Sequence, residues 1–183
     1  MQASYAYAIF HTPFGWGGLV TSEKGLRRVI LPVSSARKAE ELIRAEFPQV
    51  YLVSVRFYYW LKVFGEYFRG ERVNFEGQID LTGKSDFART ILLACRRIPY
   101  GETRSYGWLA EDAGRPKAAR AVGNVLARNP LPLVIPCHRV IKADGTLGGF
   151  SAPGGLALKA GLLQLEGIRV PFCGDFPWPA GPK

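Results

Sequence analysis

Cysteine and histidine are scarce in this 183-residue chain, which holds three cysteines and two histidines. The cysteines are odd in number and widely spaced, at Cys95, Cys137 and Cys173. This spacing argues against a disulfide framework and predicts a reducing compartment, the cytoplasm, or the nucleus if the source is eukaryotic. No CxxC or HExxH pattern occurs, and His11 and His138 lie far apart in the sequence, so we expect no metal site.

The sequence also lacks a recognisable signal peptide and an apolar run long enough to cross a bilayer, so we expect no membrane association. Acidic residues are few, with 15 Asp/Glu against 24 Lys/Arg and a net charge of +9. Residues 84–169 carry 13 basic and 6 acidic side chains, net +7, whereas residues 1–83 carry 10 and 8, net +2. A basic second half predicts a polyanion partner, and a solvated basic surface is the alternative.

The first half has the pattern of a small α/β scaffold without visible chemistry. Alternating apolar residues at 5–10, 18–21 and 26–31, separated by turn residues, predict a β-meander. Ser34 or Ser35 can cap a helix that runs to Phe47. A second helix is expected over residues 55–69, with these aromatic or apolar residues in the core: Phe57, Trp60 or Leu61, Phe64 and Phe68.

The second half changes to a helical pattern after residues 70–84, which we interpret as a linker containing a strand-like segment at 78–81. A helix from Ser85 places Phe87, Ile91 and Cys95 on one apolar face, so Cys95 is expected to be structural. We therefore predict an α+β protein with three parts. They are an N-terminal scaffold domain with its linker (1–83), a mainly helical domain with a winged helix-turn-helix (84–169) and an irregular proline-rich tail (170–183).

The helix-turn-helix is predicted from two short helices and a glycine-containing turn at residues 113–116. Ser105 can cap the first helix, and the second is expected from Lys117 to about Arg128. The second helix surrounds Arg120 with small side chains, at Ala118, Ala119, Ala121 and Gly123. A helix with such small side chains can enter a DNA minor groove, which is only about 6 Å wide. The alternative is an alanine-rich helix that packs within the protein, which would have the same sequence pattern.

An apolar run at residues 131–135 ends in Pro136, Cys137 and His138. Because a proline favours extended backbone in the residue before it, Ile135 is expected to end a buried strand-like segment. A free cysteine has a pKa near ~8.5, and the neighbouring His138 and Arg139 offer a base and a positive charge that would favour the thiolate. The alternative is a buried cysteine beside a surface histidine.

The sequence IPCHRV at residues 135–140 resembles the active-site motif of the O6-alkylguanine-DNA alkyltransferases, also called methylated-DNA–protein-cysteine methyltransferases. Members of this family move an alkyl group from O6 of guanine in DNA to their own cysteine. Segments around Tyr106, Arg120 and Glu166 match the family in the same order. The resemblance is strong from about residue 98 to residue 167 and weak before it.

The resemblance implies a role for each matching residue of the catalytic group. Cys137 would accept the alkyl group, and His138, oriented by Glu166, would remove its proton through a water molecule. Tyr106 would rotate the nucleotide through its 3′ phosphate and donate to the purine. Asn129 would order the active-site turn.

The resemblance also implies contacts with the substrate and with DNA. The backbone carbonyls of Cys137 and Val140 would accept from the guanine amine, and the Ser151 N–H would donate to O6. Phe150 stands where the family often has tyrosine, and an insertion of Ala152 and Pro153 lengthens this glycine-rich loop. Arg120 would fill the gap left by the flipped nucleotide, on a helix that touches DNA through Ala118, Ala119, Ala121 and Gly123. Asn124 replaces a common glycine.

The function implied is repair of double-stranded DNA by single-turnover transfer from O6 of guanine, and from O4 of thymine, by a monomer without a cofactor. The thioether product has no electrophilic carbonyl for water to attack, so each molecule would act once. Some family members hold a structural zinc near the N-terminus, and this chain lacks its ligands. The alternatives are a non-catalytic alkyltransferase-like lesion binder, a Cys-His-Glu hydrolase and a helix-turn-helix regulator.

Overall fold

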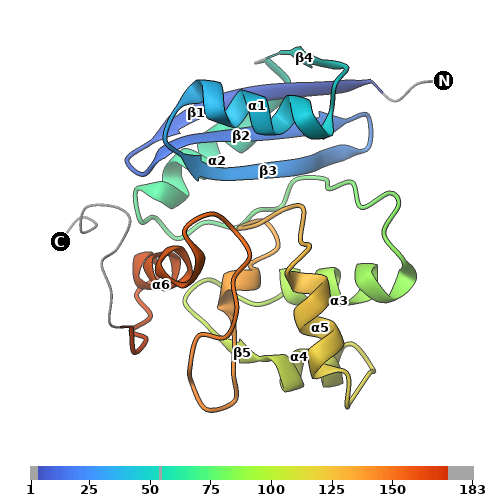
Figure 1. Cartoon of the computed structure of the whole chain (residues 1–183), viewed down its shortest axis with the longest axis vertical. Coiled ribbons are helices and arrows are strands. Elements are labelled where there is room, and N and C mark those ends of the chain that lie inside the picture. Colours follow the sequence, from blue (N-terminus) through green and yellow to red (C-terminus); the bar gives the residue numbers. More distant parts are fainter. Residues whose placement is uncertain (1–3, 54, 173–183) are drawn as a thin grey trace. The chain divides into compact units, whose positions relative to one another are not determined.

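The computed structural model describes residues 4–53 and 55–172, and its strands and helices confirm the α+β class (Figure 1). The chain forms two compact units, and the boundary between them falls between Thr82 and Gly83. Of the proline-rich tail, residues 170–172 are described and form no helix or strand, whereas Cys173 lies outside the described residues.

The first unit is built on a four-stranded sheet in the order β3-β2-β1-β4. The predicted meander is confirmed, with longer strands than expected: β1 (Tyr5–Thr12), β2 (Gly15–Ser22) and β3 (Gly25–Val33) are antiparallel neighbours. A short strand β4 (Val50–Leu52), which the sequence analysis did not predict, pairs parallel to β1. Gly25 opens β3 at φ 130°, where a side chain would collide with the carbonyl oxygen of Gln78, 2.5 Å from the site of its Cβ.

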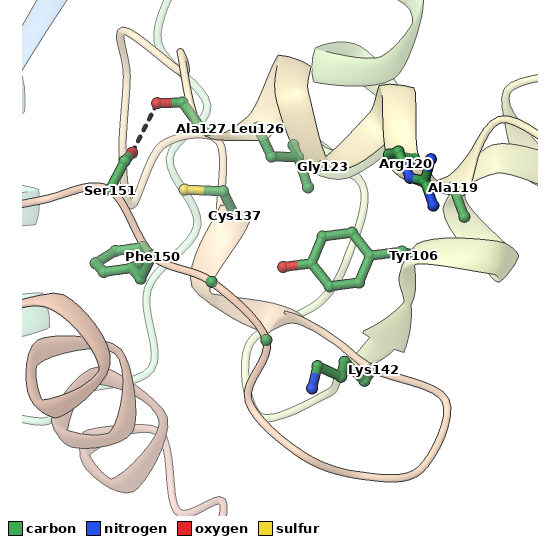
Figure 2. A pocket seen from close by; sticks show the side chains of 12 residues that line it. Tyr106, Ala119, Arg120, Gly123, Leu126, Ala127, Cys137, Lys142, Phe150 and Ser151 are labelled. Atoms are coloured by element: carbon green, nitrogen blue, oxygen red, sulfur yellow. Dashed lines mark hydrogen bonds between the residues drawn. The ribbon is translucent and has the colours of Figure 1, made fainter.

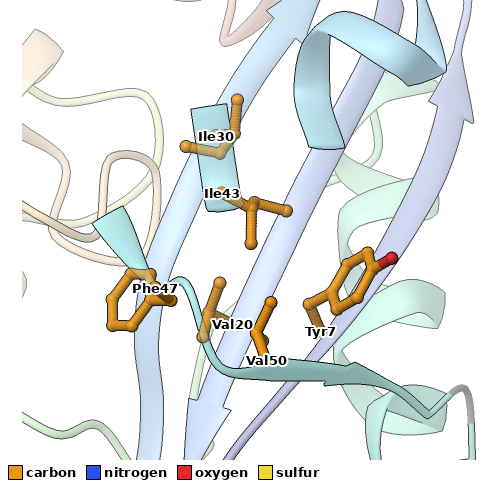
Figure 3. Packing of buried hydrophobic residues seen from close by; sticks show 6 residues of the cluster. All are labelled: Tyr7, Val20, Ile30, Ile43, Phe47 and Val50. Carbon is orange, nitrogen blue, oxygen red and sulfur yellow. The ribbon is translucent and has the colours of Figure 1, made fainter. Parts of the chain in front are cut away.

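Two helices pack on the sheet. Helix α1 (Ala36–Glu46) begins at Ser35, whose Oγ accepts a hydrogen bond from the Lys38 N–H at 3.1 Å, so the predicted cap is confirmed. Figure 3 shows the core beneath α1, made of Tyr7, Val20, Ile30, Ile43, Phe47 and Val50. A 3₁₀ turn (Val55–Phe57) leads into α2 (Tyr58–Phe68), which covers the other face, where Phe64 lies 5.5 Å from the Phe10 ring. Phe57, Trp60, Phe64 and Phe68 are buried, as predicted.

Residues 70–82, most of the segment interpreted as a linker, are hydrogen-bonded to the first unit. Leu26 donates its N–H to the Gln78 carbonyl and accepts from the Asp80 N–H, at 2.9 and 2.8 Å, so this segment runs beside the start of β3. The carboxylate of Asp80 is buried and accepts from the Ser22 hydroxyl at 2.7 Å. These bonds fasten the segment to the first unit, and the expected strand at 78–81 is reduced to one bridge between Leu26 and Ile79.

The second unit contains α3 (Asp86–Arg96), α4 (Tyr106–Asp112), α5 (Ala119–Leu126) and α6 (Gly155–Leu165), with a two-stranded parallel sheet of β5 (Arg104–Ser105) and β6 (Val140–Ile141). Ser105 caps α4 as predicted, and Ser85, from which the helical pattern was expected to start, caps α3. Cys95 is fully buried on α3, in agreement with a structural role.

Helix α5 is shorter than predicted at both ends. It starts at Ala119 because the N–H groups of Lys117 and Ala118 both bond to the Arg115 carbonyl and form a separate turn. Val122 and Leu126 are buried on its inner side, whereas Val125 is only partly buried. The action of α4 and α5 as a helix-turn-helix on DNA stays a prediction.

The core beneath α1 gives a test of stability. We expect Ile43→Ala to lower the free energy of unfolding by about 2–5 kcal/mol, because it removes buried methyl and methylene groups and leaves a cavity. Urea unfolding of the whole protein would measure this change. Arg37→Ala, which truncates a side chain that is 90% exposed, is the control and should change little. Equal midpoints for all three proteins would contradict this account of the core.

Candidate active site

The segment before Cys137 is a buried turn, and the prediction of a strand-like segment is wrong. The Ile135 N–H bonds to the Leu131 carbonyl at 2.8 Å, which brings the two ends of the segment together. Leu133, which is 1% exposed, has a positive φ of 73°. A non-glycine residue in this region costs conformational free energy and persists where the surroundings over-determine it.

The side chain of Asn129 is the main fixed point of this turn. Its Oδ1 accepts from the Leu131 N–H at 3.0 Å, and its Nδ2 donates to the Ile135 carbonyl at 2.8 Å. The same Nδ2 lies 3.2 Å from Sγ of Cys137. Asn129 therefore ties the turn to the thiol.

Cys137 begins a 3₁₀ helix (Cys137–Arg139) and is 8% exposed. Burial raises the pKa of its thiol, and the hydrogen bond from Asn129 and the positive charge of Lys159 offset this only in part. The sequence analysis expected Arg139 to supply the positive charge. Arg139 instead points to Glu166, so this expectation is wrong and the contributing cation is Lys159.

His138 and Arg139 share the carboxylate of Glu166, the residue that directly follows α6. His138 Nε2 lies 2.7 Å from Oε1 of Glu166, and Arg139 reaches Oε2 through Nε at 2.8 Å and Oε1 through Nη2 at 3.0 Å. The Gly101 N–H adds a bond of 3.2 Å to Oε2. The 3₁₀ helix is thereby joined to α6 and to the loop before β5.

These contacts set the charges of the group. Burial raises the pKa of Glu166, but the hydrogen bonds and charges of His138 and Arg139 outweigh burial and lower the pKa to about 2. Burial lowers the pKa of His138, and Glu166 opposes this only in part. At neutral pH the group thus consists of a carboxylate, a neutral imidazole and a thiol. An imidazole that donates from Nε2 to the carboxylate has Nδ1 as its basic nitrogen.

A pocket of about 650 Å³ opens beside the thiol (Figure 2). Its lining comes from α4, α5, the Cys137 turn and the glycine-rich loop: Tyr106, Ala119, Arg120, Gly123, Leu126, Ala127, Cys137, Lys142, Gly148, Gly149, Phe150 and Ser151. Figure 2 shows the Tyr106 hydroxyl pointing into the space between Cys137 and Phe150. A cavity of this size and lining suits a ligand as large as an alkylated base.

Two contacts shape the loop side of the pocket. The Ser151 hydroxyl donates to the Ala127 carbonyl at 2.6 Å, which joins the loop to the end of α5. Gly148 has φ 67°, and a Cβ there would lie 3.0 Å from the Tyr106 hydroxyl. This position therefore requires glycine for the backbone and for the tyrosine beside it.

Most of the predicted site residues come together. Tyr106, Asn129, Cys137, His138 and Glu166 form one connected region, and Phe150, Ser151, Arg120, Ala119 and Gly123 line the pocket. Ala118 and Ala121 lie on or just before α5 but do not line the pocket. Val140 is buried, and its carbonyl accepts from Lys159 Nζ at 2.6 Å, while the Cys137 carbonyl accepts from the Val140 N–H. A carbonyl has two lone pairs, so each can still accept a second donor.

Lys159 is the functional candidate that the sequence analysis missed. It is fully buried on α6, beside the pocket wall. A single lysine within the apolar run at residues 156–163 was the available signal, because such a helix is expected to carry its charges on an exposed face.

Among residues 4–53 and 55–172, no group of three or more His, Cys, Asp or Glu side chains is placed to hold a metal ion. None of the helices in the same described ranges is long and apolar enough to span a membrane.

The chain is similar to known proteins in its sequence and in its fold. The model of the family "6-O-methylguanine DNA methyltransferase, DNA binding domain" matches residues 86–168. A methylated-DNA–protein-cysteine methyltransferase of Mycolicibacterium paratuberculosis is 53% identical over 107 residues, which are 58% of this chain and 63% of that protein. That match therefore spans less than two thirds of the relative.

A second relative aligns along nearly its whole length. The methylated-DNA–protein-cysteine methyltransferase of Methanosarcina acetivorans is 39% identical over 162 residues, covering 88% of this chain and 97% of that protein. Among solved structures, Mycobacterium tuberculosis OGT in complex with DNA superposes with a TM-score of 0.73 at 35% identity, over 88% of this chain and 92% of that one. This chain belongs to the methylated-DNA–protein-cysteine methyltransferase family.

Proposed function

We propose that this methyltransferase repairs double-stranded DNA by moving the alkyl group of O6-alkylguanine to Cys137. The observation that supports it best is the position of the Cys137 thiol, which lines a pocket of about 650 Å³ next to the hydrogen-bonded His138 and Glu166. The carbon–O6 bond breaks, the sulfur–carbon bond forms, and the electron pair of the broken bond stays on the guanine. The thioether is stable to water, so each molecule acts once.

The proton of the thiol goes to His138 through a bridging water. Sγ of Cys137 contacts Asn129, and His138 contacts Glu166. These contacts fit a proton transfer in which a water molecule lies between the Cys137 and His138 side chains. A neutral imidazole next to an ionised carboxylate is able to take up a proton. Tyr106 donates its hydroxyl to the purine as negative charge develops on it.

The pocket selects guanine through its backbone. The carbonyls of Cys137 and Val140 accept from the exocyclic amine, and the Ser151 N–H donates to O6. The Ser151 hydroxyl holds the loop to Ala127, which keeps this N–H at the pocket. O4-alkylthymine presents the same alkoxy carbon and is a second substrate.

DNA is bound through α5, with Ala118, Ala119, Ala121 and Gly123 toward the minor groove. Arg120 is exposed and lines the pocket entrance, where it occupies the gap left by the flipped nucleotide. Flipping costs a few kcal/mol, and the weakened pairing of an alkylated base lowers that cost. We further propose that the protein is a monomer. We also propose that it works in the cytoplasm, since Cys95 and Cys137 are free thiols. We also propose that residues 1–83 form a scaffold domain and that residues 84–169 form the domain that binds DNA and transfers the alkyl group.

The site supports two alternative functions, a non-catalytic lesion binder and a hydrolase, less well than it supports alkyl transfer. A non-catalytic lesion binder has no use for a thiol in the pocket, and the relatives are named as methyltransferases. A Cys-His-Glu hydrolase would need an oxyanion hole for an acyl substrate, and it would turn over repeatedly.

The proposed acceptor is tested by mass spectrometry of the intact protein after mixing with duplex DNA that contains O6-methylguanine. We expect one added methyl group, mapped to Cys137, and none on Cys137→Ala, which should still bind the DNA because its groove contacts lie on α5. Cys95→Ala is the matched control and should take up one methyl group. Full repair by Cys137→Ala would refute the assignment.

The role of Arg120 is tested by comparing two substrates. We expect Arg120→Ala to slow repair of duplex DNA by about tenfold or more, because the arginine would no longer offset part of the cost of flipping. The reaction with free O6-benzylguanine, which needs no flipping, should change little. Arg89→Ala, an exposed arginine of α3, is the control. Equal losses on both substrates would instead assign Arg120 to folding.

The loop lengthened by Ala152 and Pro153 predicts tolerance of large alkyl groups. Phe150 offers an aromatic wall without a hydroxyl, and the pocket volume of about 650 Å³ leaves room for a benzyl ring. Free O6-benzylguanine should therefore add a benzyl group to Cys137 and block later repair of DNA. Phe150→Tyr, which adds one hydroxyl, measures the effect of wall polarity. An unchanged protein mass at high benzylguanine concentration, with methylated DNA still repaired, would show a tighter pocket.

A further inference from the structure

Lys159 places a charged group in the interior of the second unit. It lies in the middle of α6 and has no exposed surface. Its Nζ donates to the carbonyl oxygens of Val140 at 2.6 Å, of Leu147 at a shorter distance and of Gly149 at 3.5 Å. The catalytic steps described above do not use this side chain.

The three carbonyl oxygens belong to two different segments. Val140 directly follows the 3₁₀ helix that presents Cys137. Leu147 and Gly149 belong to the glycine-rich loop, which continues into Phe150 and Ser151 on the pocket lining. A single ammonium group thus joins the segment that carries the thiol to the loop that forms the wall beside it.

This arrangement has an energetic cost. Burial lowers the pKa of Lys159 to about 8, and the thiols of Cys137 and Cys95 oppose this only in part. The other groups that face it are His138 on the 3₁₀ helix and the Tyr106 ring, whose centre is 5.8 Å from Nζ. A methionine or leucine would fill similar space without desolvating a charge, but it could donate to none of the three oxygens.

The loop also has space on its far side. A second cavity, of about 630 Å³, is lined by the same Gly148, Gly149 and Phe150 together with Leu156 and Phe172. The wall therefore stands between two cavities, and its glycines permit many backbone conformations. A wall of this kind needs a fixed attachment to keep its distance from the thiol.

We propose that Lys159 is a positioning residue for the alkyl transfer. By holding Leu147 and Gly149 to Val140, it fixes the loop at residues 148–151 at the distance from Cys137 at which the alkyl carbon faces the sulfur. This inference rests on the proposed function and extends it, because it assigns the geometry of the pocket to a residue that does not touch the substrate.

Three variants and one control test it. Lys159→Met fills the space without donors, Lys159→Gln keeps a neutral donor, and Lys159→Arg keeps the charge. Lys62→Met removes an exposed lysine from α2 of the other unit and is the control. Single-turnover transfer from duplex DNA containing O6-methylguanine gives a maximal rate constant and a half-saturating DNA concentration for each protein.

We expect the maximal rate constant of Lys159→Met to fall about 10- to 100-fold, because small displacements of a reacting group have effects of that size. The half-saturating concentration should stay within about twofold, since α5 supplies the DNA contacts. Lys159→Gln should lose less, and Lys159→Arg least. Hydrogen exchange of the backbone amides at residues 147–151 should rise in the same order, while Lys62→Met matches the parent protein in both measurements.

An unchanged rate constant with unchanged exchange in Lys159→Met would overturn the inference. So would a parallel loss of DNA affinity and thermal stability, which would make Lys159 a general structural residue. If Lys159→Met fails to fold, the comparison of Lys159→Gln with the parent protein decides by the same criteria. Failure of the parent protein to take up a methyl group would instead refute the proposed function, and the exchange measurement would still report on the attachment of the loop.

Discussion

The hydrogen bonds of the buried Glu166 carboxylate hold together the segments that form the site. It binds His138 and Arg139 of the 3₁₀ helix and the Gly101 N–H at once, and Arg139 also donates through Nη1 to the Ile98 carbonyl at 2.6 Å. The Glu166 carboxylate therefore joins the end of α6, the segment after α3 and the 3₁₀ helix that carries Cys137. Removing any partner would leave charge buried without compensation, which is costly in a low-dielectric interior.

The same carboxylate links stability to pH. Since its pKa is lowered to about 2 in the folded protein, from an ordinary value of 4.5, its stabilising contribution is complete above pH 4.5. That contribution is lost as the pH falls toward 2. At neutral pH the ionised carboxylate and the neutral imidazole coexist, so the carboxylate that joins these segments is also the group that orients His138 in the proposed mechanism.

Local chemistry made much of this molecule predictable from its sequence. Strand alternation predicted the meander, and serine caps predicted the starts of α1 and α4, because both signals depend on neighbouring residues. The apolar run at residues 131–135 wrongly predicted a strand-like segment, because hydrophobicity does not encode the left-handed backbone of Leu133. A turn ordered by Asn129 was implied only by the family resemblance. Lys159 was missed for a related reason. Its partners are backbone carbonyls, and no side chain in the sequence marks a carbonyl that requires a donor.

The burial of Cys137 decides how the site must operate. A thiol whose pKa is raised by burial is mostly protonated at neutral pH, and a thiol is a weaker nucleophile than a thiolate. In the proposed mechanism, activation of the thiol therefore coincides with substrate binding, when the base fills the pocket and the proton passes toward His138. A resting thiol also reacts slowly with small oxidants, because they too require the thiolate. In the proposed function Cys137 is used once and is not regenerated, so protection of the thiol before it meets its substrate matters as much as its reactivity afterwards. The raised pKa supplies the protection, and the proton transfer proposed for His138 supplies the reactivity.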